Sequence, residues 1–492
     1  MAWREYHEFT KHSVESLRRT QHYLDWNNMP DPFRHYEGVP VLDLPADPPM
    51  PQAPAIEVLK GRAGSTSAKN GEAFLSQLMF YSASISASKR VASTGNVYAL
   101  RVNPSSGNLH PTEFHFCTRG LVEWPDGLYH YRASSHMAEQ RGIGDFAGKL
   151  ASVSGPLVFV LTTIAWREAW KYRDRAYRYC LHDIGHAWQA LTLAARAIGC
   201  ESFALGHFLD DAVSKCCLLN HDEWPMLLVT LQGPSIPLKR LDPAETVSFG
   251  GRPNRLSDEQ VSYPQIEKVH AATKVHSEAM IPFAGQPRQK RRGETQLPSP
   301  VTTDCIFGEV VRARRSALDF RGGDESISLS KLATLLAVTE QPLFADFAAL
   351  RFVQLYLYVH RVESLAPGVY RYWPEYAELE KIRQGNQRAV AAALSLGQGL
   401  AANACVAFSM IGDFENATRS YGDRGYRYVH FEAGAIGQRM YLAAEALSLR
   451  ATGIGAFFDE EVQRYLNLNS EQGQVVYHFA VGHPVNDPRL EA

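Results

Sequence analysis

Two short segments of this chain hold groups that could bind a flat, negatively charged ligand. The first consists of Pro104, Ser105, Ser106, Gly107 and Asn108. It lies between two ordered segments, so its backbone amides, hydroxyls and one amide side chain can face a ligand. Its small residues also let the main chain come close to a planar ring. A plain turn explains the same composition equally well, because Pro, Ser, Gly and Asn are the ordinary turn residues.

The second segment is basic and consists of Arg312, Arg314, Arg315 and Ser316. We expect it to belong to the opening helix of a domain, over residues 310–316. Guanidinium groups are forked, permanently charged donors, and with a neighbouring hydroxyl they suit a phosphate monoester. On this stretch alone, a solvated basic helix face is the better explanation, so other features must decide between the two.

A run of small residues from Thr452 to Ala456 follows the long helix expected over 429–447. Gly455 and Ala456 would allow backbone N–H groups to come within hydrogen-bonding distance of a planar heterocycle. The run is not a phosphate-binding P-loop, because no helix-opening Lys-Ser/Thr follows and the Rossmann context is missing.

The elements that must position these segments occur twice. Residues 171–179 (KYRDRAYRY) and 420–428 (SYGDRGYRY) match, and the match continues without a gap to 206–210 (GHFLD) and 455–459 (GAFFD). Such self-similarity indicates a structural unit that was duplicated and fused, so the chain is expected to form its own dimer. The repeated Asp-Arg and Tyr-Arg positions are expected to be structural, with ion pairs at the domain interface.

The two copies have kept different pieces of the candidate site. The segment from Pro104 to Asn108 is found in the first half, and its place in the second half is taken by residues 345–349 (ADFAA). Conversely, the Arg-Arg-Ser of the second half has no counterpart before Phe74. The sequence therefore predicts one ligand site per chain, assembled from both halves.

Alternating helix and strand patterns predict an α+β fold, with long helices covering mixed sheets. Strands are expected at 112–118, 157–162 and 352–359, and long helices at 184–198 and 429–447. The predicted organisation is an N-terminal arm (1–59), a first domain (60–233), a linker rich in Pro, Gly and charge (234–303) and a second domain (304–492).

Composition excludes several classes of protein. With 492 residues, 45% of them hydrophobic and 21% charged, the chain is typical of a soluble globular protein. A net charge of -2 gives no general attraction to nucleic acid or acidic membranes, and no apolar run is long enough to span a bilayer. The seven cysteines show no paired metal-ligand spacing, so we expect no metal site, and reduced thiols in a cytoplasmic protein.

Taken together, the motifs resemble the flavin-dependent nitroreductase superfamily, and within it the SagB-type (ThcOx-like) dehydrogenases. The resemblance covers most of the chain from about residue 60 onward. It depends on Arg-Arg-Ser at 314–316, Pro-Ser-Ser-Gly-Asn at 104–108, YGDRGYRY at 421–428 before a long helix and GIGAF at 453–457 after it.

The resemblance implies FMN bound where two subunits meet, here the two fused halves. Carried over to this chain, Arg312, Arg314, Arg315 and Ser316 would hold the phosphate, and Gly455 and Ala456 would lie near flavin N5. Pro104 to Asn108 would cross from the first domain. Arg489, near the end of the chain, is a further phosphate candidate, although a surface arginine is the simpler reading.

Lys171 and Tyr172 are the catalytic candidates. The second repeat has Ser420-Tyr421 at the same place, so the lysine is specific to the first half. In SagB-type dehydrogenases a Lys-Tyr pair at the equivalent position is linked to proton removal. Lysine can act as a base if its surroundings lower its pKa, and tyrosine can relay a proton. A surface lysine that caps a loop is the alternative.

The resemblance thus predicts an FMN-dependent oxidoreductase that transfers hydride through flavin N5. A small molecule or a modified peptide with azoline rings is the expected substrate, and NAD(P)H is a possible donor. A flavin-binding or sequestering protein without turnover is the main alternative. A pseudo-dimer without any ligand would require both retained motifs to be accidental.

Overall fold

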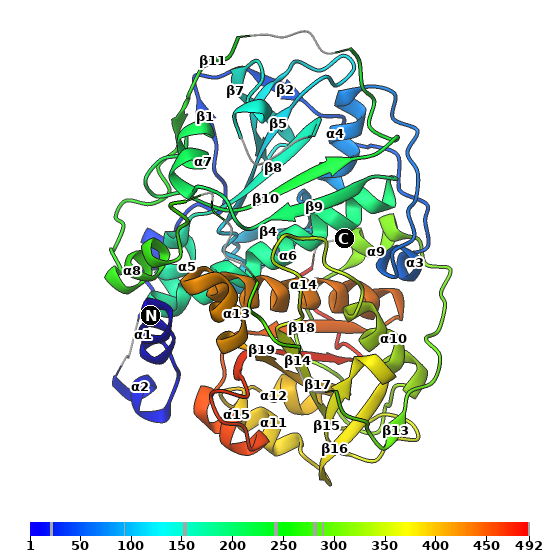
Figure 1. Ribbon diagram of the computed structural model, residues 1–492. Helices are drawn as coiled ribbons and strands as arrows, with labels where there is room; N and C mark the ends of the chain where they lie inside the picture. Colours follow the sequence, from blue (N-terminus) through cyan, green and yellow to red (C-terminus); the bar gives the residue numbers. More distant parts are fainter. Residues whose placement is uncertain are drawn as a thin grey trace.

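The computed structural model describes residues 1–19, 23–92, 94–150, 155–240, 245–277, 279, 283–287 and 290–490. Two sheets lie at opposite ends of the molecule, and two long helices run side by side between them (Figure 1). These helices are α6 (Ala176–Ala197) and α14 (Gly425–Ala446), and they belong to the two sequence repeats. The duplication seen in the sequence is therefore also a duplication of structure.

The first sheet is built mainly from the first half of the chain. Its strand order is β11-β7-β6-β5-β8-β10-β9, and β2 also pairs with β7. The strands are β2 (Val41–Asp43), β5 (Thr112–Thr118), β6 (Gly127–Arg132), β7 (Met137–Ile143), β8 (Leu157–Thr163), β9 (Glu201–Leu205), β10 (Trp224–Gln232) and β11 (Val247–Ser248).

The second sheet repeats this arrangement with the order β13-β16-β15-β14-β17-β19-β18. Its strands are β13 (Thr295–Gln296), β14 (Val353–Val359), β15 (Gly368–Trp373), β16 (Glu378–Gln384), β17 (Val406–Gly412), β18 (Arg450–Ile454) and β19 (Gln474–Gly482). The named strands pair antiparallel, and parallel bridges join Ala204 to Ala345 and Ser316 to Ala451 at the sheet edges. The α+β fold with two sheets flanked by helices is confirmed.

Two small ribbons and shorter helices complete the fold. The ribbons are β1 (Tyr36–Glu37) with β12 (Arg252–Pro253), and β3 (Ile85–Arg90) with β4 (Val97–Arg101). The remaining α-helices are α1 (Ala2–Phe9), α2 (Val14–Arg19), α3 (Ala55–Leu59), α4 (Gly71–Phe80), α5 (Ala165–Tyr172), α7 (Asp210–Cys216), α8 (Pro264–Ala272), α9 (Phe307–Ala313), α10 (Leu329–Thr339), α11 (Arg388–Leu394), α12 (Gly399–Asn403), α13 (Phe414–Tyr421) and α15 (Asp459–Leu466).

Glycines permit the close contact between the two central helices. A Cβ on Gly185 of α6 would lie 2.3 Å from the carbonyl oxygen of Phe431, and one on Gly434 of α14 would lie 2.2 Å from that of His182. Gly185 and Gly434 hold the same position in the two repeats. The helices therefore cross backbone to backbone at matching residues, near the axis that relates the halves.

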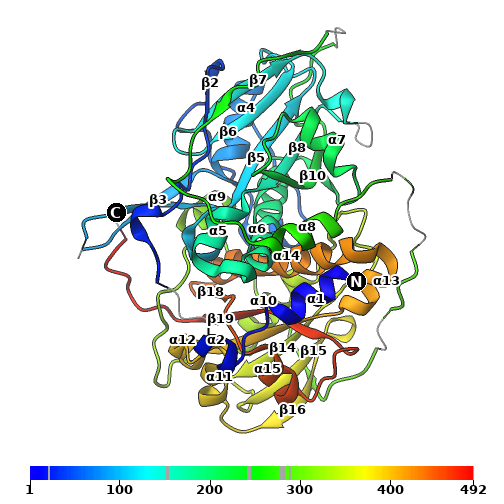
Figure 2. The ribbon, with the colours of Figure 1, turned by 90° about the vertical axis from the view of Figure 1, so that its left-hand side faces the viewer.

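The N-terminal residues connect the halves from outside. Helix α1 lies beside α13 and α8 (Figure 2), and its Trp3, Tyr6 and His7 are buried. Tyr6 donates a hydrogen bond to the carbonyl of Asp174 in the first repeat, and His7 Nδ1 lies 3.3 Å from the Tyr426 hydroxyl in the second. Aromatic packing thus fixes this helix across both repeats.

The basic segment is not placed as the sequence suggested. Helix α9 ends at Ala313, and Arg314 already leaves the helical conformation with φ -54° and ψ 125°. Ser316 instead bridges to Ala451 on the edge of β18, and the Ala317 amide donates to the Ala451 carbonyl at 2.9 Å. The helix expected over 310–316 was wrong, because pairing with the sheet edge replaces its last turn.

Candidate functional site

A cavity of about 350 Å³ is lined by the three segments that the sequence predicts to bind a ligand. The first half contributes Pro104 to Asn108 and Tyr172, and the second half contributes Arg314 to Ser316 together with Gly455 and Ala456. Its volume lies within the range of small-molecule sites, which is about 300–1,000 Å³. Residues from both halves are therefore needed to form its walls.

The loop from Ser105 to Asn108 is held by side chains behind it. The Ser106 amide donates to both carboxylate oxygens of Asp183, at 3.1 and 3.0 Å, and its hydroxyl donates to Oδ1 at 3.1 Å. Asn108 Nδ2 donates to the Ala99 carbonyl at 3.0 Å. Gly107 has φ +60°, a left-handed conformation that suits glycine. These bonds fix the loop in an open position at the cavity wall.

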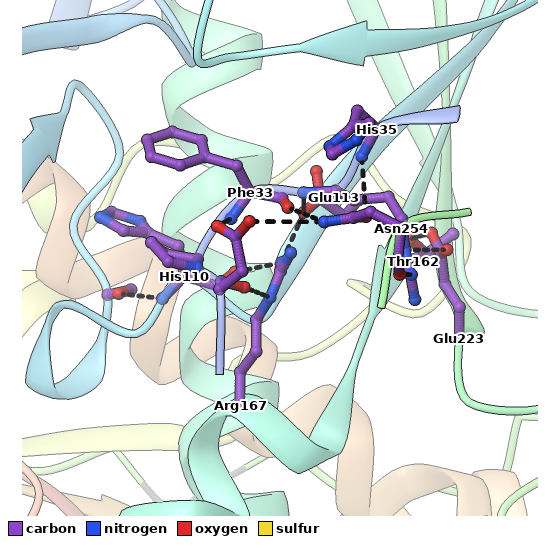
Figure 3. A network of polar contacts seen from close by, with 12 residues as sticks. Phe33, His35, His110, Glu113, Thr162, Arg167, Glu223 and Asn254 are labelled. Carbon is purple, nitrogen blue, oxygen red and sulfur yellow. Dashed lines mark hydrogen bonds and ion pairs between the residues drawn. The ribbon is translucent and has the colours of Figure 1, made fainter. Parts of the chain in front are cut away.

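A buried polar network supports this loop from the outer side (Figure 3). The Arg167 guanidinium donates to the His110 carbonyl at 2.7 Å and to the Glu113 carboxylate at 2.5 Å. His110 in turn lies 3.0 Å from the Asn108 side chain, and its amide donates to the Ser105 hydroxyl at 2.8 Å. Arg167 and Glu113 are buried as an ion pair. Separating them would leave two uncompensated charges in the interior, which costs free energy, so the pair holds this support in one geometry.

The matching position in the second half is closed. Asp346 and Phe347 occupy the places that Ser105 and Ser106 have in the first half. The Gly206 and His207 amides donate to the Asp346 carboxylate at 2.8 and 3.0 Å, and Phe347 stacks on Tyr428 with ring centroids 4.2 Å apart. Because Gly206 and His207 are the counterparts of Gly455 and Ala456, a carboxylate and a ring fill the space that the cavity leaves open.

One end of the cavity is cationic. Arg314 donates to the Val102 and Arg101 carbonyls at 3.2 and 3.0 Å, while its Nη1 is buried without a partner among the described residues. Burial and the neighbouring positive charges of Arg314 and Arg450 lower the pKa of Arg315 to about 10. A cluster of guanidinium groups with an unused donor is suited to an anion such as a phosphate.

Two predicted phosphate residues are placed outside the cavity lining. Arg312 donates to the Ser84 hydroxyl at 2.8 Å and lies over the Phe80 ring. Arg489 is bound by the Asp487 carboxylate at 2.7 and 2.8 Å. Lys89 of the β3–β4 ribbon lines the cavity instead, with its ammonium 3.8 Å from Asp487.

At the opposite wall, the Tyr179 ring packs against the backbone of Gly455. A Cβ on Gly455 would lie 2.2 Å from Cε1 of Tyr179, so no larger residue fits there. The Tyr179 hydroxyl donates to the Gly455 carbonyl at 3.1 Å, and Gln398 donates to the Ala456 carbonyl at 3.2 Å. These bonds fix the orientation of the Gly455–Ala456 backbone.

Lys171 and Tyr172 come to the loop at Gly107 from the end of α5. Tyr172 lines the cavity, and Lys171 does not. Both reach Gly107, where a Cβ would lie 2.7 Å from the Tyr172 hydroxyl and 3.2 Å from the Lys171 ammonium. Burial raises the pKa of Tyr172 well above its ordinary value, so this phenol keeps its proton.

Sequence reasoning missed several lining residues, including Asp183, His186, Tyr441 and Tyr477. The Tyr441 hydroxyl lies 2.9 Å from that of Ser316 and accepts from the Gly453 amide at 2.8 Å. A comparison of the repeats could have indicated two of these residues, since Glu432 and Ala435 take the places of Asp183 and His186. No motif in the sequence indicates that Tyr441 and Tyr477 line the cavity.

The expected ion pairs at the interface are present, and each joins one half to the other. Arg175 and Arg178 contact Asp459 at 3.0 and 2.7 Å, and Arg424 and Arg427 contact Asp210 at 2.8 and 3.1 Å. All of these side chains are buried. The repeated motif is thus a reciprocal connection between the halves.

In the described residues, no cluster of three or more His, Cys, Asp or Glu side chains could hold a metal ion. Across the same part of the chain, no helix has the length and apolar character to cross a membrane.

Comparison with known proteins identifies the family. Residues 90–233 and 311–483 both match the nitroreductase family. The chain belongs to this family, whose members are generally oxidoreductases, and it contains two of its domains in tandem. A crystal structure of a provisionally assigned nitroreductase from Anabaena variabilis has a TM-score of 0.79 and 27% identity, covering 98% of this chain and 99% of that one.

Shorter stretches match three other proteins. A provisionally assigned nitroreductase of Methanocaldococcus jannaschii is 37% identical over 119 residues, which is 24% of this chain and 59% of that protein. The microcin B17-processing protein McbC of Escherichia coli is 28% identical, over 27% of this chain and 54% of McbC. The trifolitoxin operon protein TfxC of Rhizobium leguminosarum is 30% identical, over 22% of this chain and 31% of TfxC. The matched part is thus less than two thirds of each relative, and the similarity to McbC and TfxC agrees with the SagB-type relationship expected from the motifs.

Proposed function

We propose that this chain is an FMN-dependent oxidoreductase that binds one flavin between its fused halves. The cavity is the observation that supports this most strongly, because it combines a cationic end with walls of small residues from both repeats. The unused Arg314 donor fits a phosphate, and the small residues Gly455 and Ala456 that line the cavity fit a flat ring. FMN contains both groups.

In this proposal each residue has a distinct task. Arg314, Arg315 and Ser316 bind the phosphate, and Lys89 adds a third positive charge beside it. Gly455 and Ala456 face the ring near N5, and Pro104 to Asn108 cover it from the first half. The flavin, when bound, supplies the ability to accept or return a hydride at N5. Arg312 and Arg489 lie outside the cavity lining, and in this proposal they add positive charge near the phosphate end.

Binding is tested by purifying the chain, recording its absorbance spectrum, releasing the cofactor and identifying it. We expect one FMN per chain, because Asp346 and Phe347 fill the matching position. Arg314→Ala with Arg315→Ala should abolish flavin retention, and Arg383→Ala, which removes a guanidinium bound to the distant Tyr465 carbonyl, should not. Unchanged flavin in the double variant would contradict the assigned phosphate site.

We further propose that the reaction is a dehydrogenation and that the substrate is a modified peptide or a small molecule. The similarity to a protein named for microcin B17 processing supports a peptide with azoline rings. NAD(P)H as a donor, and a cytoplasmic location, stay predictions. Lys171→Ala should keep the flavin but slow dehydrogenation; a normal rate would remove Lys171 from the mechanism.

The alternative is a protein that stores flavin without turnover. The cavity's partial enclosure by both halves is compatible with storage, so the deciding measurement is kinetic. A stored flavin that is reduced chemically would not be reoxidised by added quinones under anaerobic conditions. Rapid reoxidation would favour the oxidoreductase.

A further inference from the structure

Beneath the cavity wall lies a pair of carboxyl groups that the proposed function does not yet use. Glu168 is on α5 and Asp183 is on α6, with exposed fractions of 0% and 2%. Their side chains are in hydrogen-bonding contact with each other. Asp183 lines the cavity, whereas Glu168 lies behind it.

The partners of the two carboxyl groups differ. Asp183 accepts three hydrogen bonds from Ser106, which favour its ionised form. For Glu168, neither oxygen meets a donor among the described residues if the group is treated as a carboxylate. Two carboxyl groups can bond to each other only when one carries a proton. The hydrogen-bond pattern therefore assigns that proton to Glu168, which donates to Asp183.

The carboxyl pair lies close to the catalytic candidates Lys171 and Tyr172. Glu168 lies three and four residues before Lys171 and Tyr172, so all three occupy one face of α5. Ser106, which binds Asp183, precedes Gly107, where the Lys171 ammonium and the Tyr172 hydroxyl converge. One loop thus contacts both the carboxyl pair and the catalytic candidates.

The second repeat provides an internal comparison. At the positions of Glu168 and Lys171 it has Ala417 and Ser420, so the acid and the amine are both absent from the closed half. Asp183 is replaced by Glu432, which instead accepts from the Phe352 and Val353 amides at 2.9 and 3.1 Å. A proton-sharing pair is thus found where the cavity is open and is missing where it is closed.

We propose that Glu168 and Asp183 form a proton-sharing pair that exchanges protons with substrate through Tyr172 and Lys171. This rests on the proposed oxidoreductase function. Oxidation of a two-hydrogen donor breaks two bonds to hydrogen: one hydrogen leaves as hydride with the electron pair, to the cofactor, and the other leaves as a proton. That proton passes by Tyr172 and Lys171 to Asp183, and the reverse transfer supplies the proton when an acceptor is reduced.

The surroundings favour a pair that carries one proton over two ionised carboxylates. Burial, and then the charge of Asp183, raise the pKa of Glu168 well above its ordinary value, and burial also raises the pKa of Asp183. The groups that face the pair are Lys171 and Tyr172 from α5, Cys180 from α6, and Tyr477 from β19. Lys171 is the one cation of this set, so one shared proton is needed to limit the buried negative charge.

The first test does not require flavin. Infrared difference spectra of the full chain, wild type minus Glu168→Gln, should contain the carbonyl stretch of a neutral carboxylic acid near neutral pH. Glu432→Gln, at the position that matches Asp183, removes a carboxylate bonded to two amides and should produce no such band. Absence of the band in the Glu168 difference spectrum would overturn the proton assignment.

The second test measures proton transfer with a probe acceptor. The flavin-loaded chain is reduced with dithionite and mixed anaerobically with menadione, whose reduction consumes one hydride and one proton. Glu168→Gln should bind flavin normally but slow this step on the order of 100-fold, the usual contribution of general acid catalysis. It should also flatten the pH profile, and Glu432→Gln should behave as wild type.

Glu168→Ala reproduces the residue of the second repeat and should slow the step similarly. Wild-type rates in both Glu168 variants would overturn the role in proton transfer. A wild-type chain that holds no flavin, or whose flavin menadione does not oxidise, would instead refute the proposed function and this catalytic role with it. The infrared band would still decide whether the pair shares a proton.

Discussion

At the scale of single residues, the cavity depends on places where a side chain is absent. Gly107 leaves room for the Tyr172 hydroxyl and the Lys171 ammonium, and Gly455 leaves room for the Tyr179 ring. In both cases the missing Cβ lets a phenol approach the backbone that faces the ligand. The chemistry proposed for Lys171 and Tyr172 therefore requires glycine at position 107 as much as it requires the two side chains.

Gly107→Ala tests this requirement. A methyl group would lie 2.7 Å from the Tyr172 hydroxyl and force it to move, and alanine at φ +60° costs about 1–2 kcal/mol. We expect that loss of stability, retained flavin and slower reoxidation of the reduced protein by menadione. Stability is measured by urea unfolding, and the rate by stopped-flow absorbance.

Gly323→Ala is the matched control for backbone strain. Gly323 has φ +70°, and a Cβ there would meet no atom within 4 Å. It should lose a similar amount of stability and keep the wild-type rate. Equal rates in the two variants would show that the contact at Gly107 does not position Tyr172.

At the scale of elements, α6 and α14 set the distance between the halves. Their glycines meet the opposite backbone, so the contact cannot adjust by rotating a side chain. Both faces of the cavity are attached to these helices or to the strands beside them. The width of the cavity is therefore determined where Gly185 and Gly434 cross.

Gly434→Ala should destabilise the fold by about 1–3 kcal/mol or more, the usual cost of overpacking a core. It should also weaken flavin retention, because separating the helices widens the cavity. Urea unfolding and the ratio of flavin to protein check these effects. Gly399→Ala, whose Cβ would meet its nearest atom at 4.0 Å, is the control. Equal stability of the two variants would contradict the close crossing.

The repeat made the main elements predictable from sequence. Strands 112–118 and 157–162 and the helix expected at 429–447 occur close to the expected bounds. The helix expected at 184–198 ends as predicted, but α6 already begins at Ala176. The end of α9 was not predictable, because it depends on pairing of Ser316 with Ala451, more than a hundred residues away. The β3–β4 ribbon that carries Lys89 to the cavity is equally determined by tertiary contacts.

The site was predictable where a motif combines several unusual residues. Arg314, Arg315 and the segment from Pro104 to Asn108 do line one cavity, as their separation between the halves suggested. Single polar residues inside a helix form no such motif, and a comparison of the two repeats is the one sequence signal that could have indicated Asp183. The carboxyl pair of Asp183 and Glu168 is recognised only in the structure, where the fold brings α5, α6 and the loop at Ser106 together.

At the scale of the whole molecule, the two halves are connected by reciprocal ion pairs. Asp459 of the second half binds Arg175 and Arg178, and Asp210 of the first half binds Arg424 and Arg427. Burial alone would raise the pKa of each aspartate, but the two arginines beside it reverse this and leave the pKa below its ordinary value. Each pair therefore stabilises the fold in a pH-dependent manner.

The direction of that dependence follows from the lowered pKa. An unfolded aspartate ionises with a pKa of about 3.9. The stabilisation is fully present above that pH and is lost as the pH falls through the lower pKa of the folded state. Asp459→Asn or Asp210→Asn should each cost about 3–5 kcal/mol near neutral pH, because two buried arginines lose their counter-charge. The difference from wild type should shrink in acid.

The two variants should differ in their effect on the cofactor. Asp459 follows the Gly455–Ala456 wall, and its partner Arg175 also reaches the Gly455 carbonyl at 3.5 Å. Asp210 holds the same position behind the closed counterpart at Gly206. Asp459→Asn should therefore reduce both stability and flavin retention, whereas Asp210→Asn should reduce stability alone. Flavin content of the two variants is compared at equal fractions of folded protein. Equal loss of flavin in both would contradict a specific role of Asp459 in supporting the open site.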